Sequence, residues 1–201
     1  MNYIVLDLEW NQCPTGKENE LQHLPFEIIE IGAVRLNDTL QKEDEFHEVI
    51  QPQFYTSLHH RTREVISLCD SDFQTARFFS DVIRDFFDWC GKNPVFCTWG
   101  PADLTELQRN LAYHQLPSPF PFPLIYFDIQ KIFSILYEDR KSRRSLEYAV
   151  DFLHINKDIP FHSAFSDALY TAQIVSKMAP EQIAANSSID YYKTPQNRRQ
   201  T

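Results

Sequence analysis

The sequence predicts one α/β domain built around a mixed β-sheet, and three observations support this prediction. Three apolar segments separated by polar turns occupy the first 50 residues, as in an antiparallel meander. Two shorter strand-like segments then alternate with stretches of helical periodicity. The length of 201 residues, 43% of them hydrophobic, is enough for a single domain with a substantial core.

The first strand is expected over residues 4–9, and it ends in two acids. Side chains of a strand alternate between faces, so Asp7 and Glu9 converge on one face. That face also carries Tyr3 and Val5, whereas Ile4, Leu6 and Leu8 take the other. On a covered strand, two unpaired carboxylates would be costly, and a hard cation such as Mg²⁺ or Mn²⁺ would remove that cost. The alternative is two acids at a solvated strand end, and Asp-x-Glu alone does not decide.

The next segments complete the expected meander. Residues 11–26 are polar and contain two prolines and a glycine, which indicates a loop. Strands are expected over residues 27–36 and 46–50. Residues 51–71 are irregular and include a basic cluster over 59–63, which could be a solvated loop or a phosphate contact.

The middle of the chain is expected to alternate between helices and strands. An aromatic stripe at helical spacing predicts a helix over 72–90, and a short strand follows over 94–99. Gly100 and Pro101 suit the turn into a helix that continues to Tyr113. Asp103 then lies near a helix N-terminus just beyond a strand end, where sites gather in such sheets. An acid that stabilises the helix dipole is the other interpretation.

The last third follows a proline-rich connector over 117–123. It contains an expected strand over 124–127 and expected helices at about 129–138, 145–154 and 164–178. The basic run over 139–144 could contact a phosphate backbone or form an ordinary turn. Pro180 ends the last helix, so the expected domain covers residues 1–180, followed by a polar, mobile tail over 181–201.

Composition and charge exclude several classes of protein. A formal net charge of −9 argues against a protein that coats nucleic acid through bulk positive charge, although not against local contacts. No segment approaches the ~18 to 20 apolar residues of a membrane span, so a soluble, cytoplasmic protein without a membrane partner is expected. The cysteines lack metal-binding or disulfide spacing, which disfavours structural zinc and a disulfide-linked partner. They are Cys13, Cys69, Cys90 and Cys97.

One segment near the C-terminal end gives these acids a common context. Residues 162–167 read H-x-A-x-x-D, and the chain thereby resembles the DEDDh family of 3′→5′ exonucleases, whose first motif matches Asp7-Leu8-Glu9. Asp103 falls where the aspartate of the second motif belongs. The resemblance covers about residues 2–178, and details such as Trp99-Gly100 are similar to the enhanced-RNAi-type exoribonucleases and their sporulation-inhibitor-like bacterial relatives.

The resemblance implies a ribonuclease H-like fold, with a mixed five-stranded sheet, and two-metal phosphodiester hydrolysis. Two Mg²⁺ or Mn²⁺ ions ~3.5 to 4 Å apart would clamp the scissile phosphate. The implied metal ligands are Asp7, Glu9, Asp103 and Asp167. His162 would act as the general base, since an imidazole with an unperturbed pKa of ~6.5 suits this role near neutral pH.

The resemblance also implies contacts with the 3′ end of single-stranded RNA or DNA, RNA being favoured. The implied contacts are Leu8, Trp10, Trp99 and Leu104, although both tryptophans could instead belong to the core. Two departures from the family pattern concern the approach to His162, which reads Ile159-Pro160-Phe161, and the sequence around Asp103.

Three alternatives to this function remain. One is a binding module of the same fold that grips RNA or protein without chemistry. The second is a DNA-directed exonuclease, and the third is an endonuclease of the same general fold. The oligomeric state and the physiological substrate are left open.

Overall fold

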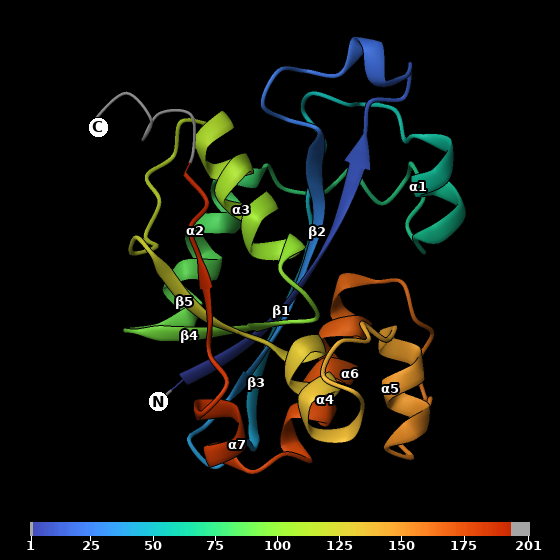
Figure 1. Cartoon of the computed structure of the whole chain (residues 1–201). Coiled ribbons are helices and arrows are strands. Elements are labelled where there is room, and N and C mark those ends of the chain that lie inside the picture. The colour runs from blue at the N-terminus through green and yellow to red at the C-terminus, as the bar shows by residue number, and fades with distance from the viewer. Residues whose placement is uncertain (1, 194–201) are drawn as a thin grey trace.

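The computed structural model describes residues 2–193 and contains a mixed sheet of six strands with helices on both faces (Figure 1). The strands lie in the order β3-β2-β1-β4-β5-β6. β1 pairs antiparallel with β2 and parallel with β4; β2–β3 is antiparallel, β4–β5 parallel and β5–β6 antiparallel. Their bounds are β1 Asn2–Gln12, β2 Phe26–Leu36, β3 Lys42–Val49, β4 Pro94–Thr98, β5 Leu124–Asp128 and β6 Ser188–Asp190. The predicted antiparallel meander is confirmed.

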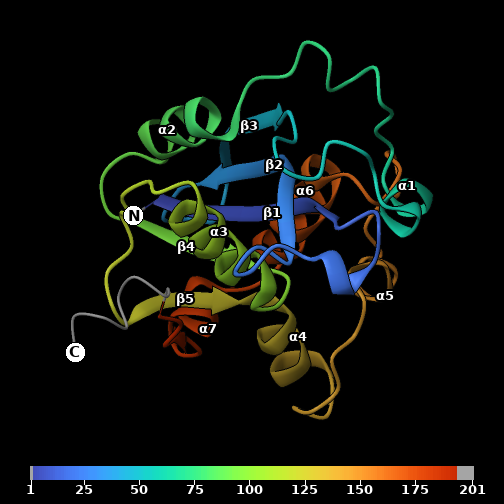
Figure 2. The ribbon, with the colours of Figure 1, turned by 90° about the horizontal axis from the view of Figure 1, so that it is seen from above.

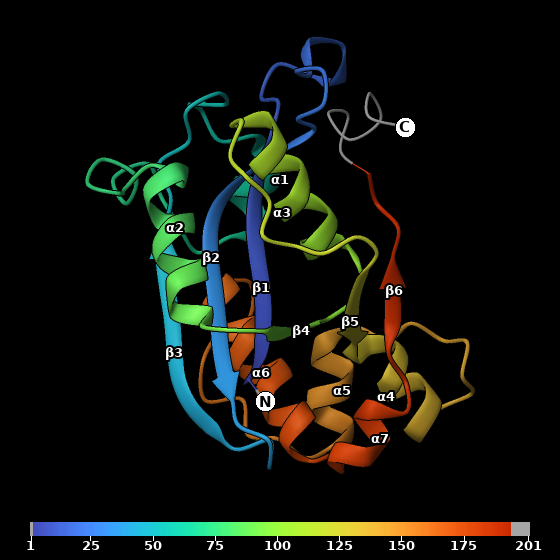
Figure 3. The ribbon, with the colours of Figure 1, turned by 90° about the vertical axis from the view of Figure 1, so that its left-hand side faces the viewer.

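Helices cover the two faces of the sheet in separate groups (Figures 2 and 3). α2 and α3 pack on one face, and α4, α5 and α6 pack on the other. The helices are α1 His60–Val65, α2 Phe79–Cys90, α3 Ala102–Tyr113, α4 Ile129–Tyr137, α5 Leu146–Phe152, α6 Ala164–Ser176 and α7 Pro180–Ala184, with a short 3-10 turn η1 at Lys17–Asn19.

Strand β1 is covered on both sides, as its apolar pattern predicts. Ile4, Leu6 and Leu8 are buried in the core beneath α2 and α3. Tyr3 and Val5 are buried in the core beneath α4, α5 and α6. Because the alternation is preserved, Asp7 and Glu9 emerge on the α6 face near the middle of the sheet.

Several predicted element boundaries differ from the structure. Strands β1 and β3 begin earlier than expected, at Asn2 and Lys42, and the largest differences lie within residues 51–90. The helix expected over 72–90 begins only at Phe79, and the irregular segment 51–71 contains α1. The Asp72 carboxylate accepts a hydrogen bond from the Cys69 N–H, 2.7 Å away, and this local turn competes with helix formation. Phe73, part of the expected aromatic stripe, is instead buried against Ile29 beneath the loop.

The sheet has one strand more than predicted, and this strand comes from the expected tail. Within residues 181–193 the structure contains most of α7 and all of β6, which pairs with β5. The Asp190 carboxylate accepts a hydrogen bond from the Gln108 side chain of α3 at 2.8 Å. A three-residue strand carries no detectable periodicity, so this pairing depends on the sheet edge that β5 offers. Residues 194–201 of the expected tail lie outside the described residues.

None of the cysteines forms a disulfide within the described residues 2–193. All four cysteines are free thiols; Cys13, Cys90 and Cys97 are buried, and Cys69 is exposed. The three buried thiols pack as small apolar side chains.

Within residues 2–193, none of the helices has the length and apolarity needed to cross a membrane.

Candidate active site

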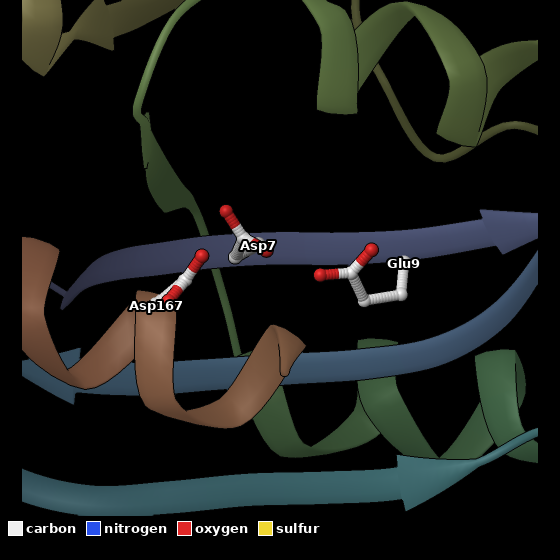
Figure 4. A group of neighbouring side chains, drawn as sticks. All are labelled: Asp7, Glu9 and Asp167. Carbon is white, nitrogen blue, oxygen red and sulfur yellow. The ribbon is translucent and has the colours of Figure 1, made fainter. Parts of the chain in front are cut away.

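Three carboxylates from β1 and α6 form a compact cluster (Figure 4). Asp7 and Glu9 extend from the same face of β1, and Asp167 reaches toward them from the first turn of α6. One carboxylate oxygen from each residue lies within 4.8 Å of the others. The structure therefore brings together three of the four acids that the sequence motifs singled out.

Asp103, the fourth acid, lies beside this cluster in the first turn of α3. It is 5% exposed, and its Oδ1 accepts a hydrogen bond from the Leu8 N–H at 3.2 Å. This bond joins α3 to β1 between Asp7 and Glu9. Asp103 is close enough to Asp7 for its negative charge to raise the pKa of Asp7. Stabilisation of the helix dipole would explain why Asp103 lies in the first turn of α3, but it would not explain this hydrogen bond to β1.

His162 lies at the exposed rim of the cluster, in the loop before α6. Its backbone N–H donates to Asp167 Oδ1 at 3.2 Å, so the histidine and the acid are held together. The backbone φ of His162 is +70°, a left-handed conformation that is uncommon outside glycine and asparagine. The turn leaves the imidazole exposed next to Asp167, where a general base could reach a solvent molecule.

Gly32 allows α6 to approach the sheet at this point. Gly32 on β2 is paired directly with Asp7 on β1. A Cβ atom at Gly32 would overlap the backbone of Ala164 and Phe165 in the first turn of α6. The missing side chain thus lets the start of α6 lie directly on the sheet, which places Asp167 over β1.

Replacing Gly32 by alanine is expected to push α6 away from the sheet. Overpacking of this kind costs about 1 to 3 kcal/mol of stability, and it would also separate Asp167 from Asp7. We expect a lower Tm in thermal unfolding and weaker Mn²⁺ binding in calorimetry. An unchanged Tm together with an unchanged Mn²⁺ affinity would contradict the role assigned to this close contact.

Burial and repulsion from neighbouring carboxylates raise the pKa of all four acids. Burial is the largest cause for Asp7, whose pKa lies well above the ordinary value, and the charges of Asp103 and Asp167 add to it. Burial, followed by the charge of Glu30, raises the pKa of Glu9 to about 8. Burial raises the pKa of Asp103 to about 7 and also raises the pKa of Asp167, although backbone N–H donors oppose both shifts.

The donor set fits a small divalent cation. All the atoms are carboxylate oxygens, which Mg²⁺ and Mn²⁺ prefer as ligands. Oxygens on opposite sides of an octahedral Mg²⁺ lie about 4 Å apart, so Asp7, Glu9 and Asp167 could surround one ion after small adjustments. A positive charge at this point would also offset the repulsion that raises the pKa values.

The raised pKa values predict how the stability of the metal-free protein depends on pH. In the folded protein the pKa of Glu9 is about 8 and that of Asp103 about 7. These carboxyl groups therefore still hold protons at a pH where the same groups of the unfolded chain, with pKa values near 4, have released them. Stability must then fall as the pH rises through this range. Between pH 6.5 and 8.5 we expect a loss on the order of 2 kcal/mol.

This loss can be measured by urea unfolding of chelator-treated protein. Measurements start at pH 6.5 because burial lowers the pKa of His114, whose protonation opposes the trend in more acidic solution. Glu9→Gln should flatten the slope, and added Mn²⁺ should restore stability at pH 8.5. Stability that stays constant or increases over this interval would argue against the repulsive cluster.

A fifth acid, Glu30, belongs to this environment and was not predicted from the sequence. It is 1% exposed and lies opposite Glu9 in the β1–β2 pairing. Its Oε1 lies 2.8 Å from His47 Nε2, while its Oε2 is buried without a hydrogen-bond partner. The sequence did contain one indication of this role: Glu30 is an acid inside the apolar segment 27–36, where an exposed side chain is not expected.

The four residues implied as substrate contacts occupy two kinds of position. Leu8 and Leu104 are buried in the core beneath α2 and α3. Trp10 and Trp99 are half-buried. The Trp10 ring lies 5.5 Å from that of Phe26, and Trp99 Nε1 donates to the Arg144 carbonyl at 3.2 Å. Their contact with a substrate therefore stays a prediction.

Comparison with known proteins gives one family match and several distant relatives. The family model RNase_T, described as "Exonuclease", matches residues 4–175. The human "3'-5' exoribonuclease 1" is 24% identical over 185 residues, which cover 87% of this chain and 51% of that protein. The chain thus spans about half the length of this curated relative.

Solved structures share the fold at low sequence identity. The nuclease domain of 3'hExo, described as a DEDDh family member bound to rAMP, is 22% identical with a TM-score of 0.75. The match covers 93% of this chain and 96% of that chain. Pop2p from S. pombe, in an Mg²⁺- and Mn²⁺-bound form, is 16% identical with a TM-score of 0.64, covering 87% of this chain and 81% of that one.

Proposed function

The chain belongs to the exonuclease family RNase_T, and from this premise we propose that it removes nucleotides from the 3′ end of single-stranded nucleic acid. Its fold is the ribonuclease H-like fold expected from the resemblance. The proposed reaction is hydrolysis of the terminal phosphodiester bond, with release of nucleoside 5′-monophosphates. RNA is the favoured substrate because the human relative is an exoribonuclease.

The observation that carries this proposal is the carboxylate cluster beside His162. Asp7, Glu9 and Asp167 offer oxygens within 4.8 Å of one another, and His162 is tied to Asp167 by a 3.2 Å hydrogen bond. Asp103 lies against the same strand. These four acids would hold two Mg²⁺ or Mn²⁺ ions, which when bound supply an activated water and charge stabilisation for the leaving oxygen.

The side chains perform the remaining tasks in the proposed reaction. His162 accepts the proton of the attacking water from its exposed position at the rim. The Leu8 N–H keeps the Asp103 carboxylate oriented, and the His162 N–H does the same for Asp167. Trp10 and Trp99 would hold the terminal nucleotide by sequence-tolerant stacking.

The test is cleavage of matched 5′-labelled single-stranded RNA and DNA in Mn²⁺ or Mg²⁺. We expect a ladder that shortens from the 3′ end, faster for RNA, and that stops reversibly when a chelator is added. Internal fragments of defined length would indicate an endonuclease instead. Metal binding without cleavage of either strand would indicate a binding module.

A further inference from the structure

A cavity of about 370 Å³ lies at the C-terminal end of β1, away from the carboxylate cluster. Its walls come from the loop after β1, the start of β2 and the start of α1. They include Lys17, Glu20, Phe26, His59, His60 and Arg61, and we refer to this cavity as the α1 pocket. Figure 1 shows α1 beside the C-terminal end of β1.

The cations of the α1 pocket are free for a ligand. Within residues 2–193, neither Lys17 nor Arg61 forms an ion pair with a carboxylate, and both side chains are exposed. Arg63, two residues further along the same helix, is instead paired with Asp70 at 3.1 Å and does not line the pocket. Within the part of the chain that the structure describes, the basic cluster over 59–63 therefore contains one arginine that is paired with a carboxylate, Arg63, and one that is not, Arg61.

Two arginines of the other basic run of the sequence, over 139–144, differ in this respect. Arg143 pairs with the buried Asp128 at 3.0 Å, and Arg144 pairs with Glu138 at 3.1 Å. The Arg144 guanidinium also lies 4.7 Å from the centre of the Tyr148 ring. These two arginines stabilise the connection between α4 and α5, so they are less available to an anionic ligand than Lys17 and Arg61.

The α1 pocket is fixed to the strand that carries the carboxylate cluster. The Asn11 side chain accepts a hydrogen bond from the His59 N–H at 2.9 Å, which attaches the start of α1 to β1. Gln12 also lines the pocket, and it lies three residues beyond Glu9, or about 10 Å along a strand. Phe26 lies between the α1 pocket and the end of the carboxylate cluster. Its ring lines the pocket and also contacts Trp10, the residue after Glu9.

We propose that the α1 pocket binds a backbone phosphate of the nucleic-acid strand, upstream of the 3′ end, through Lys17, His60 and Arg61. This inference rests on the proposed exonuclease function. Gln12 lies about 10 Å along the strand from Glu9, which places the contact upstream of the terminal nucleotide rather than on it. Arginine and lysine suit phosphate oxygens, and local cations are needed in a chain with a net charge of −9.

The experiment compares Arg61→Ala with Arg63→Ala, which removes the same charge from the same helix. The KM for removal of the first nucleotide is measured on single-stranded RNA of two and of eight nucleotides, and binding of the eight-nucleotide strand is followed by fluorescence anisotropy. For Arg61→Ala we expect an increase in KM on the order of tenfold on the longer strand and a smaller increase on the dinucleotide. Arg63→Ala should match the wild type.

Salt dependence gives an independent readout of a phosphate contact. The slope of log Kd against log salt should decrease by about 0.7 in Arg61→Ala, as expected for one lost contact with a single strand. Equal effects of the two variants, or an Arg61→Ala effect that is independent of strand length, would overturn the proposal while leaving the exonuclease function intact.

If the wild type does not cleave either strand, the proposed function is contradicted, but the phosphate site can still be tested by binding. The anisotropy measurements then decide: weaker, less salt-dependent binding by Arg61→Ala alone would support the phosphate site. No binding of the strand by the wild type would overturn it.

Discussion

Replacing Asp7 by asparagine is expected to reduce the rate of cleavage on the order of 10³-fold or more. Asp7 lies at the centre of the site: the charges of Asp103, Asp167, Glu9 and Glu30 all act on it. An asparagine keeps the volume and one oxygen but loses the negative charge needed to hold a divalent cation. The single-turnover rate on 5′-labelled RNA at saturating Mn²⁺ measures this loss.

The stability of the same variant separates chemistry from misfolding. Because Asp7→Asn removes a buried charge from a repulsive cluster, the metal-free variant should be at least as stable as the wild type at pH 8. Asp38→Asn, which removes an exposed acid from the turn between β2 and β3, is the matched control and should retain full activity. A well-folded Asp7→Asn protein that still cleaves at the wild-type rate would refute the assigned site.

Replacing His162 by asparagine is expected to reduce the rate by a factor on the order of 10² to 10⁴, the usual contribution of a general base. Asparagine is chosen because the backbone φ at this position is +70°, and asparagine tolerates that conformation better than alanine does. The fold should therefore be retained while the imidazole is lost. The rate is measured at saturating metal, so that it reports on chemistry rather than on ion binding.

The control for this variant is His154→Asn. His154 is also exposed and has a φ of +52°, but it lies after α5, outside the carboxylate cluster. The rate of His154→Asn at saturating metal should match that of the wild type, because this substitution leaves the site unchanged. Equal rates for the two histidine variants would exclude a base function for His162.

Much of the site could be predicted from local sequence because its parts lie on regular elements. The alternation of β1 places Asp7 and Glu9 on one face, and the structure keeps that alternation. The spacing of His162 and Asp167 spans the start of a helix, where a loop residue and a residue of the first turn come together. Such patterns involve only residues close in the chain, so periodicity reports them directly.

Other parts of the site depend on contacts between distant segments. The Leu8 N–H that holds Asp103 is 95 residues away from it in the chain, and Gly32 makes room for Ala164 from the far end of the sequence. Glu30 enters the cluster through pairing of β2 with β1. No local pattern encodes these contacts, because each depends on which strands and helices become neighbours.

The sequence by itself determined the order of most strands and helices, the faces of β1 and the signature acids. Only the tertiary structure decided that Ser188–Asp190 adds a sixth strand, and that the two basic clusters differ. Arg61 and Arg143 both belong to short basic runs, yet only Arg143 has a buried carboxylate within reach. The reason is physical: whether a charge is free or neutralised depends on its neighbours in space, and these are set by packing.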